Sequence, residues 1–106
     1  MGLIKDIGNL DVYFRELNSN PGKLVVVDFH AVWCPPCRAI APQVHRLAEA
    51  NDIVVVKVDV DEAQDVASRE GVQAMPTFLF YKDGRKVDEF RGAQKKALDE
   101  TVQKYK

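Results

Sequence analysis

Residues 24–37 read LVVVDFHAVWCPPC, an apolar run that ends in the two cysteines of the chain. The run is rich in β-branched residues, which predicts a strand covered on both faces. Two prolines separate Cys34 from Cys37, and they suit the first turn of a helix because that turn needs no backbone N–H donors. The stretch therefore predicts a strand that delivers two thiols, one turn apart, to the beginning of a helix.

Apolar spacing on either side of this stretch continues the alternation of strands and helices. Three helices are expected from apolar residues at helical spacing: Leu10, Tyr13, Phe14 and Leu17, then Ile40, Val44, Leu47 and Ala48, and finally Leu98, Thr101, Val102 and Tyr105. Further strands are expected at residues 3–7, 53–58, 77–82 and 85–90. Asp83-Gly84 is a hairpin signal, and residues 61–64 have the pattern of a capping box that opens a short helix ending at Gly71. We expect an α/β fold with a mixed sheet and helices on both sides.

Composition limits the class of protein. The 106 residues fit one domain, expected over 1–106, and 46% apolar residues suffice for one core. A net charge of −1 indicates no nucleic-acid partner, and apolar runs of at most four residues indicate no membrane span. The first residues lack a secretory signal, and a C-x-x-C in a strand–helix pattern is typical of redox chemistry in a reducing compartment. We therefore expect a cytoplasmic protein.

The cysteine pair allows three interpretations. A bridge across two residues closes almost no loop, so it contributes little as a structural staple. A zinc site needs further ligands, and only His30 and His45 are available, neither at zinc-finger spacing. Redox exchange fits better, because the N–H groups of Cys37 and Arg38 at the helix N-terminus would face the Cys34 sulfur and favour its thiolate. We expect Cys34, the more exposed sulfur, to attack a substrate disulfide and Cys37 to resolve the mixed disulfide.

One charge interrupts each of two apolar strands, Asp28 in the first and Lys57 in the second. Unpaired buried charges are costly, so opposite charges on neighbouring parallel strands predict that these side chains approach each other. Burial should raise the pKa of Asp28, and Lys57 should partly counteract that rise. We expect Asp28 to accept and return a proton for Cys37 through water, with a polar pair that only fixes strand register as the alternative.

Motifs along nearly the whole chain resemble the thioredoxin family. They are Val27-Asp28-Phe29, Ala31, Trp33-Cys34-x-Pro36-Cys37, Pro42, Lys57-Val58-Asp59-Val60-Asp61, Met75-Pro76-Thr77 and Phe90-Arg91-Gly92-Ala93. The resemblance implies the thioredoxin fold, a central mixed five-stranded sheet flanked by four helices. It also implies a protein-disulfide reductase that acts on disulfide-containing targets, needs no cofactor beyond its own redox-active disulfide, and is re-reduced by a reductase.

The resemblance further implies a substrate groove. Pro76 would be a cis-proline that faces the disulfide. An extended target segment would bind through backbone hydrogen bonds in a groove lined by Met75, Pro76, Gly92 and Ala93. Trp33 would flank the groove, with a buried core position as the alternative for this side chain.

Three residues near the cysteines are expected to tune the site: His30, Pro35 and Pro36. Most thioredoxins have glycine at the position of Pro35, and Trp-Cys-Pro-Pro-Cys-Arg is the form seen in tryparedoxins and nucleoredoxins. His30 would adjust a thiolate pKa or contact a substrate, or it would simply face the surface. Two other functions stay open, a tryparedoxin-like carrier re-reduced by a low-molecular-weight dithiol and a binding module in a larger complex. We expect a monomer.

Overall fold

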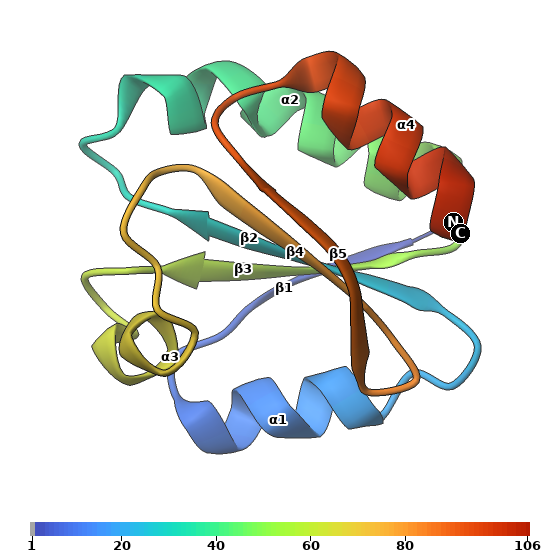
Figure 1. Ribbon diagram of the computed structural model, residues 1–106, viewed down its shortest axis with the longest axis horizontal. Coiled ribbons are helices and arrows are strands. Elements are labelled where there is room, and N and C mark those ends of the chain that lie inside the picture. The colour runs from blue at the N-terminus through green and yellow to red at the C-terminus, as the bar shows by residue number, and fades with distance from the viewer. Residues whose placement is uncertain (1) are drawn as a thin grey trace.

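The structure is a computed structural model that describes residues 2–106 (Figure 1). Over that range the elements are β1 (Leu3–Asp6), α1 (Leu10–Asn18), β2 (Leu24–His30), α2 (Pro35–Ala50), β3 (Val54–Asp59), α3 (Gln64–Arg69), β4 (Thr77–Lys82), β5 (Arg85–Arg91) and α4 (Lys95–Tyr105). The strands form one sheet in the order β1-β3-β2-β4-β5. β1, β3 and β2 are parallel, whereas β4 and β5 run antiparallel to their neighbours. The expected mixed sheet with flanking helices is confirmed.

Helices cover both faces of the sheet, α2 and α4 on one face and α1 and α3 on the other (Figure 1). Successive residues of a strand point to opposite faces, and β2 supplies both cores in this way. Val25 and Val27 pack into the cluster shared with α1 and α3, whereas Leu24 and Val26 pack into the cluster shared with α2 and α4. All residues from 24 to 29 are buried, which explains why the run contains so few polar side chains.

The turns follow the chemistry of their residues. Asp83 and Gly84 both have positive φ, 53° and 80°, as a tight hairpin between β4 and β5 requires. Gly71 has φ +68° just after α3, where a helix commonly ends on a left-handed residue. Both turn predictions are confirmed. Within residues 2–106, none of the helices combines the length and the apolar character needed to span a membrane.

Two local predictions are wrong. Phe14 was expected on the buried face of α1, but only Tyr13 and Leu17 are buried there, and Phe14 lies exposed under the Arg69 guanidinium, 5.5 Å from its ring centroid. The apolar spacing covers a wider arc than the core covers, so its outermost member faces solvent.

The capping box at residues 61–64 is the second error. Ala63 is the N-cap of α3, and no side chain caps this helix. The Asp59 carboxylate accepts hydrogen bonds from the N–H groups of Asp61 and Glu62, at 2.9 and 3.3 Å, and so organises the preceding loop. The Asp61 carboxylate is therefore available for a different contact.

A cluster that the sequence did not reveal joins three elements. Tyr13 on α1 and Tyr81 on β4 both donate hydrogen bonds to Oε2 of Glu70, which follows α3, and the bond from Tyr81 measures 2.7 Å. Burial and the nearby carboxylate raise the pKa of both tyrosines, so both stay protonated donors. The cluster fixes the end of α3, from which the chain continues to residues 75–76.

Candidate active site

The two cysteines occupy the first turn of α2. Cys34 is the N-cap residue, and Pro35 and Pro36 take the first two helical positions, as expected. Cys34 and Cys37 form a disulfide, with their Cα atoms 5.3 Å apart. The Cys37 backbone N–H donates to Cys34 Sγ at 3.2 Å. A donor and the positive end of the helix dipole both stabilise negative charge on that sulfur once the bridge opens.

Two details of the cysteine prediction are wrong. The Arg38 N–H donates to the Cys34 carbonyl oxygen at 3.2 Å, in the normal helical pattern, and not to the sulfur. Exposure does not favour Cys34 either, because Cys34 is 3% exposed and Cys37 is 6% exposed. Ala31 is buried with the pair, and Met75 packs against it. The assignment of the nucleophile therefore rests on the N-cap position and the donated N–H.

Trp33 lies on the surface next to Cys34. It is 62% exposed, so the core-aromatic alternative is wrong. Its Nε1–H donates to Asp61 Oδ2 at 2.8 Å. The Asp61 carboxylate is available for this bond because it does not cap α3. The neighbouring Val32 is exposed as well, so the loop before the disulfide presents an apolar surface to solvent. The hydrogen bond to Asp61 holds the Trp33 ring of this surface in one orientation.

Replacing Asp61 with alanine should raise the KM for a disulfide-containing protein about fivefold, since the Trp33 ring loses one hydrogen bond of ordinary strength. Asp61→Asn keeps an oxygen acceptor and should leave the KM near the wild-type value. Steady-state kinetics with a protein substrate measure both variants. Equal KM values for Asp61→Ala and wild type would show that the ring needs no such support.

The predicted groove residues come together beside the disulfide. The Met75–Pro76 peptide bond is cis, as the resemblance implied. The Gly92 N–H donates to the Pro76 carbonyl oxygen at 2.8 Å, and Gly92 has φ +92°, which favours glycine. This bond places the loop that contains Gly92 and the exposed Ala93 against residues 75–76, next to the cysteines that Met75 contacts.

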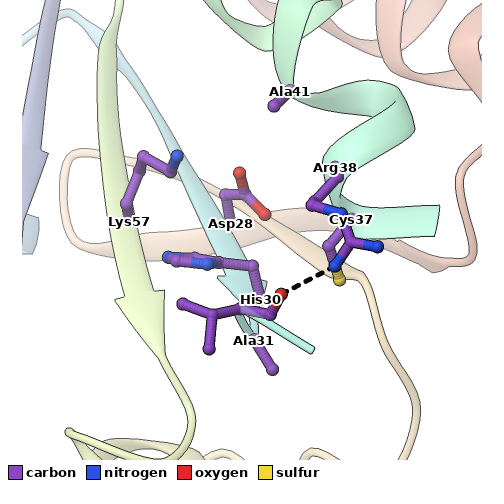
Figure 2. Close-up of a pocket in the computed structure, with 8 residues that line it drawn as sticks. Asp28, His30, Ala31, Cys37, Arg38, Ala41 and Lys57 are labelled. Carbon is purple, nitrogen blue, oxygen red and sulfur yellow. Dashed lines mark hydrogen bonds between the residues drawn. The ribbon is translucent and has the colours of Figure 1, made fainter. Parts of the chain in front are cut away.

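A pocket of about 270 Å³ lies beside Cys37 (Figure 2). Its lining residues are Asp28, His30, Ala31, Val32, Cys37, Arg38, Ala41 and Lys57. Asp28 and His30 occupy alternate positions of β2 and so share one face of the sheet. Lys57 on β3 pairs with Asp28 in the parallel register. The predicted approach of the two charges is confirmed.

Asp28 is the buried titratable group of this pocket. It is 4% exposed, and its Oδ1 has no hydrogen-bond partner among the described residues. Burial raises the pKa of Asp28 to about 6, and the positive charge of Lys57 limits the rise. Both predicted influences on this carboxyl are confirmed. The result is a group that exchanges a proton near neutral pH beside Cys37.

His30 is half-buried and lines the same pocket. Burial and the nearby Lys57 lower the pKa of His30, and the surrounding carboxylates only partly oppose this effect. His45 lies exposed on α2, apart from this pocket. Across residues 2–106, no cluster of three or more His, Cys, Asp or Glu side chains is arranged to hold a metal ion.

Comparison with known proteins gives consistent matches. The family model described as Thioredoxin matches residues 8–104. Thioredoxin from Gallus gallus is 50% identical over 101 residues, which cover 94% of this chain and 96% of that protein. Thioredoxin from Coprinus comatus is 47% identical over 105 residues, covering 96% and 97%. The X-ray structure of Fasciola hepatica thioredoxin superposes with a TM-score of 0.92 at 45% identity, covering 96% of this chain and 99% of that one.

Proposed function

This chain belongs to the thioredoxin family and is a thiol-disulfide oxidoreductase that reduces protein disulfides, and from that premise we propose how its residues divide the reaction. Thioredoxins act on disulfide-containing targets and are re-reduced by thioredoxin reductase. The proposal rests chiefly on one observation, the Cys37 N–H that donates to Cys34 Sγ at the N-terminus of α2.

Cys34 acts as the nucleophile and Cys37 as the resolving thiol. In the reduced protein the Cys34 thiolate attacks a target disulfide, forms a bond to one target sulfur and releases the other as a thiolate. Cys37 then attacks Cys34 Sγ, the protein disulfide closes, and the second target thiolate leaves. The target gains two electrons, and the protein loses two.

Asp28 acts as the base for Cys37. The two residues line one pocket, and a carboxyl with a pKa of about 6 is largely ionised at neutral pH. Asp28 takes the Cys37 proton through water as Cys37 attacks, and returns it when Cys37 is released as a thiolate in the next cycle. Lys57 keeps the carboxyl from becoming too basic, because its charge opposes the effect of burial.

The groove beside the disulfide holds the target as an extended segment. Met75 and Pro76, with the adjoining loop of Gly92 and Ala93, line this groove beside the disulfide, so that backbone groups of the segment find hydrogen-bond partners without regard to its sequence. Trp33 covers one end of the groove. Such a site suits a reductase with many targets, since the recognition is carried mainly by backbone atoms.

We propose that the protein is a monomeric electron carrier of the cytoplasm. In this proposal residues 1–106 form a single domain, and its own disulfide is the only redox group. Neither a nucleic acid nor a membrane is a partner in this proposal. A carrier re-reduced by a low-molecular-weight dithiol is not favoured, because relatives named thioredoxin are about half identical to this chain.

Insulin reduction tests the function. With NADPH and a vertebrate thioredoxin reductase, the protein should precipitate insulin chains catalytically, and dithiothreitol should replace the reductase as donor. The double variant Cys34→Ser/Cys37→Ser is the matched control and should equal the background. Failure of the wild-type protein with dithiothreitol as donor would exclude the carrier function.

Pro35→Gly should make the disulfide easier to reduce. Glycine adds a backbone N–H donor to the first turn of α2, whose positive end stabilises the Cys34 thiolate, and it loosens the reduced turn. Both changes favour the dithiol form, so the reduction potential should rise by roughly 10–30 mV, which corresponds to about 0.5–1.4 kcal/mol. Equilibration with glutathione measures the potential. A change of only a few millivolts, or one of opposite sign, would contradict a tuning role for Pro35.

A further inference from the structure

A partly buried carboxylate lies at the end of α3 and takes no part in the exchange chemistry. Oε2 of Glu70 accepts hydrogen bonds from the hydroxyls of Tyr13 on α1 and Tyr81 on β4. Within residues 2–106, no lysine or arginine forms an ion pair with this carboxylate. Burial and the carboxylate raise the pKa of both tyrosines, so both hydroxyls are donors at neutral pH. Hydrogen bonds to a charged acceptor are the stronger kind, so the two tyrosines hold Glu70 firmly.

The helix that ends at Glu70 depends on contacts with other elements. α3 has six residues, and no side chain caps its N-terminus at Ala63. An isolated helix of that length does not form in water, because nucleation costs more than so few hydrogen bonds return. At its beginning the Asp65 carboxylate accepts the Leu10 N–H of α1 at 3.0 Å, and Val66 packs into the core. At its end the contact is that of Glu70 with the two tyrosines. The place where the chain leaves α3 is therefore set by Glu70.

Two anchors limit the movement of residues 71–76, the segment between α3 and β4. The N–H groups of Gly71 and Val72 donate to carbonyl oxygens of α3, so this end of the segment follows the helix. At the other end the Thr77 hydroxyl donates to the Ala74 carbonyl oxygen at 2.6 Å, and Thr77 is buried at the beginning of β4. The sheet thus fixes one end of the segment, whereas the other end is only as fixed as α3.

Met75 connects this segment to the target groove, because it packs against the cluster of Ala31 and the two cysteines. We propose that Glu70, held by Tyr13 and Tyr81, is a positioning residue that keeps residues 71–75 in the arrangement a protein target binds. Order that exists before binding lowers the entropy that association costs. The inference rests on the proposed function, since it takes this groove as the place where targets bind.

A positioning role separates protein targets from small disulfides. A protein target that meets a loose segment must order it on binding, so its affinity falls. Cys34 keeps its N-cap position and the Cys37 N–H, so the exchange step itself is unchanged. A small disulfide such as cystamine has no peptide backbone to place in the groove, and its reaction should be insensitive to Glu70.

Four variants test the role. Glu70→Ala removes the acceptor, and the double variant Tyr13→Phe/Tyr81→Phe removes both donors but keeps the rings in the core. Glu70→Gln is the conservative variant, because its amide oxygen still accepts two hydrogen bonds. Glu16→Ala is the matched control. This carboxylate is also partly buried and accepts hydrogen bonds, from Lys5 at 2.7 Å and Asn20 at 3.2 Å, and neither partner belongs to α3 or to residues 71–76.

Single-turnover kinetics measure the effect. Protein that has been reduced and freed of donor is mixed with insulin at a series of concentrations, and the loss of free thiols is followed. In Glu70→Ala and in the double variant the half-saturating insulin concentration should rise about fivefold, the effect of ordering one further side chain on binding. The limiting rate, and the second-order rate with cystamine, should stay at the wild-type values. Glu70→Gln should recover most of the affinity, and Glu16→Ala should lose none.

Amide hydrogen exchange tests the physical cause in the double variant. The amide protons of Gly71 and Val72 should exchange faster than in wild type, relative to those of β2, which report on unfolding of the whole chain. Unchanged relative exchange would overturn the inference. So would a half-saturating concentration in Glu70→Ala equal to that of wild type, an equal rise in Glu16→Ala, or a parallel loss with cystamine. Failure of the wild-type protein to reduce insulin would defeat the proposed function instead.

Discussion

Cys34→Ser is expected to abolish insulin reduction. Cys37→Ser is expected to form the mixed disulfide with its target but not to resolve it, so that a covalent complex accumulates. Cys34 is the sulfur that receives a backbone N–H at the beginning of α2, so its removal eliminates the nucleophile. Turnover should fall by about a thousandfold or more, because the remaining Cys37 lacks the N-cap position. In Cys37→Ser the first exchange is intact, but nothing resolves the mixed disulfide.

A target with one disulfide makes the asymmetry visible. The reduced variants are mixed with it, quenched with iodoacetamide, and separated without reductant. A band at the summed mass should form with Cys37→Ser and be absent with Cys34→Ser and with the double variant. The reverse pattern, a stable complex only in Cys34→Ser, would require the roles of the two cysteines to be exchanged.

Asp28→Asn is expected to stabilise the oxidised protein at neutral and alkaline pH. The pKa of Asp28 rises from 3.8 to about 6 on folding, so the folded state binds this proton more tightly. Well below pH 3.8 the carboxyl is protonated in both states, and its ionisation costs no stability. As pH rises through 6, ionisation destabilises the folded wild type by about 3 kcal/mol, for roughly two units at 1.4 kcal/mol each. Asparagine does not titrate and avoids this loss.

Urea unfolding at pH 4 and pH 8 measures the effect. The difference in unfolding free energy between Asp28→Asn and wild type should be about 2.4 kcal/mol larger at pH 8 than at pH 4. Asp99→Asn, on the exposed side of α4, is the control and should show no such pH dependence. A constant difference across this range would mean that the carboxyl is not held in a charge-destabilising environment.

The same variant should be a poorer reductase. Without the carboxylate, Cys37 loses its base, and resolution of the mixed disulfide at pH 7 should slow by about tenfold or more. The defect should shrink towards pH 5, where most wild-type Asp28 is protonated and does not act as a base either. Stopped-flow rates across this range test the role. A profile parallel to that of wild type would leave Asp28 with a purely structural role in strand register.

Patterns local to one segment predicted most of the fold. The Asp83-Gly84 hairpin followed from residues that tolerate positive φ, and the buried strand followed from its β-branched composition. The approach of Asp28 and Lys57 was also predictable, because two opposite charges in neighbouring buried strands have few other partners. The cis bond before Pro76 was different in kind, since only the family resemblance pointed to it.

Contacts between distant segments were beyond the reach of such patterns. Asp61 had the spacing of a helix cap, but its carboxylate bonds Trp33, 28 residues away in sequence. The two tyrosines that share Glu70 come from different elements, and no spacing links them. Met75 packs against the cluster of Ala31 and the two cysteines from another loop. Each of these contacts depends on which distant side chains meet in the folded chain, and the pattern of one segment does not contain that information.

The central position of β2 makes it a reporter for the stability of the whole molecule. This strand is hydrogen-bonded to β3 on one side and to β4 on the other, and its residues 24–29 are buried. No local fraying frees its amide protons, so they should exchange with deuterium only when the entire chain unfolds. Because Asp28 lies in this strand, its replacement by asparagine should slow that exchange at pH 8 by the same free energy that urea reveals.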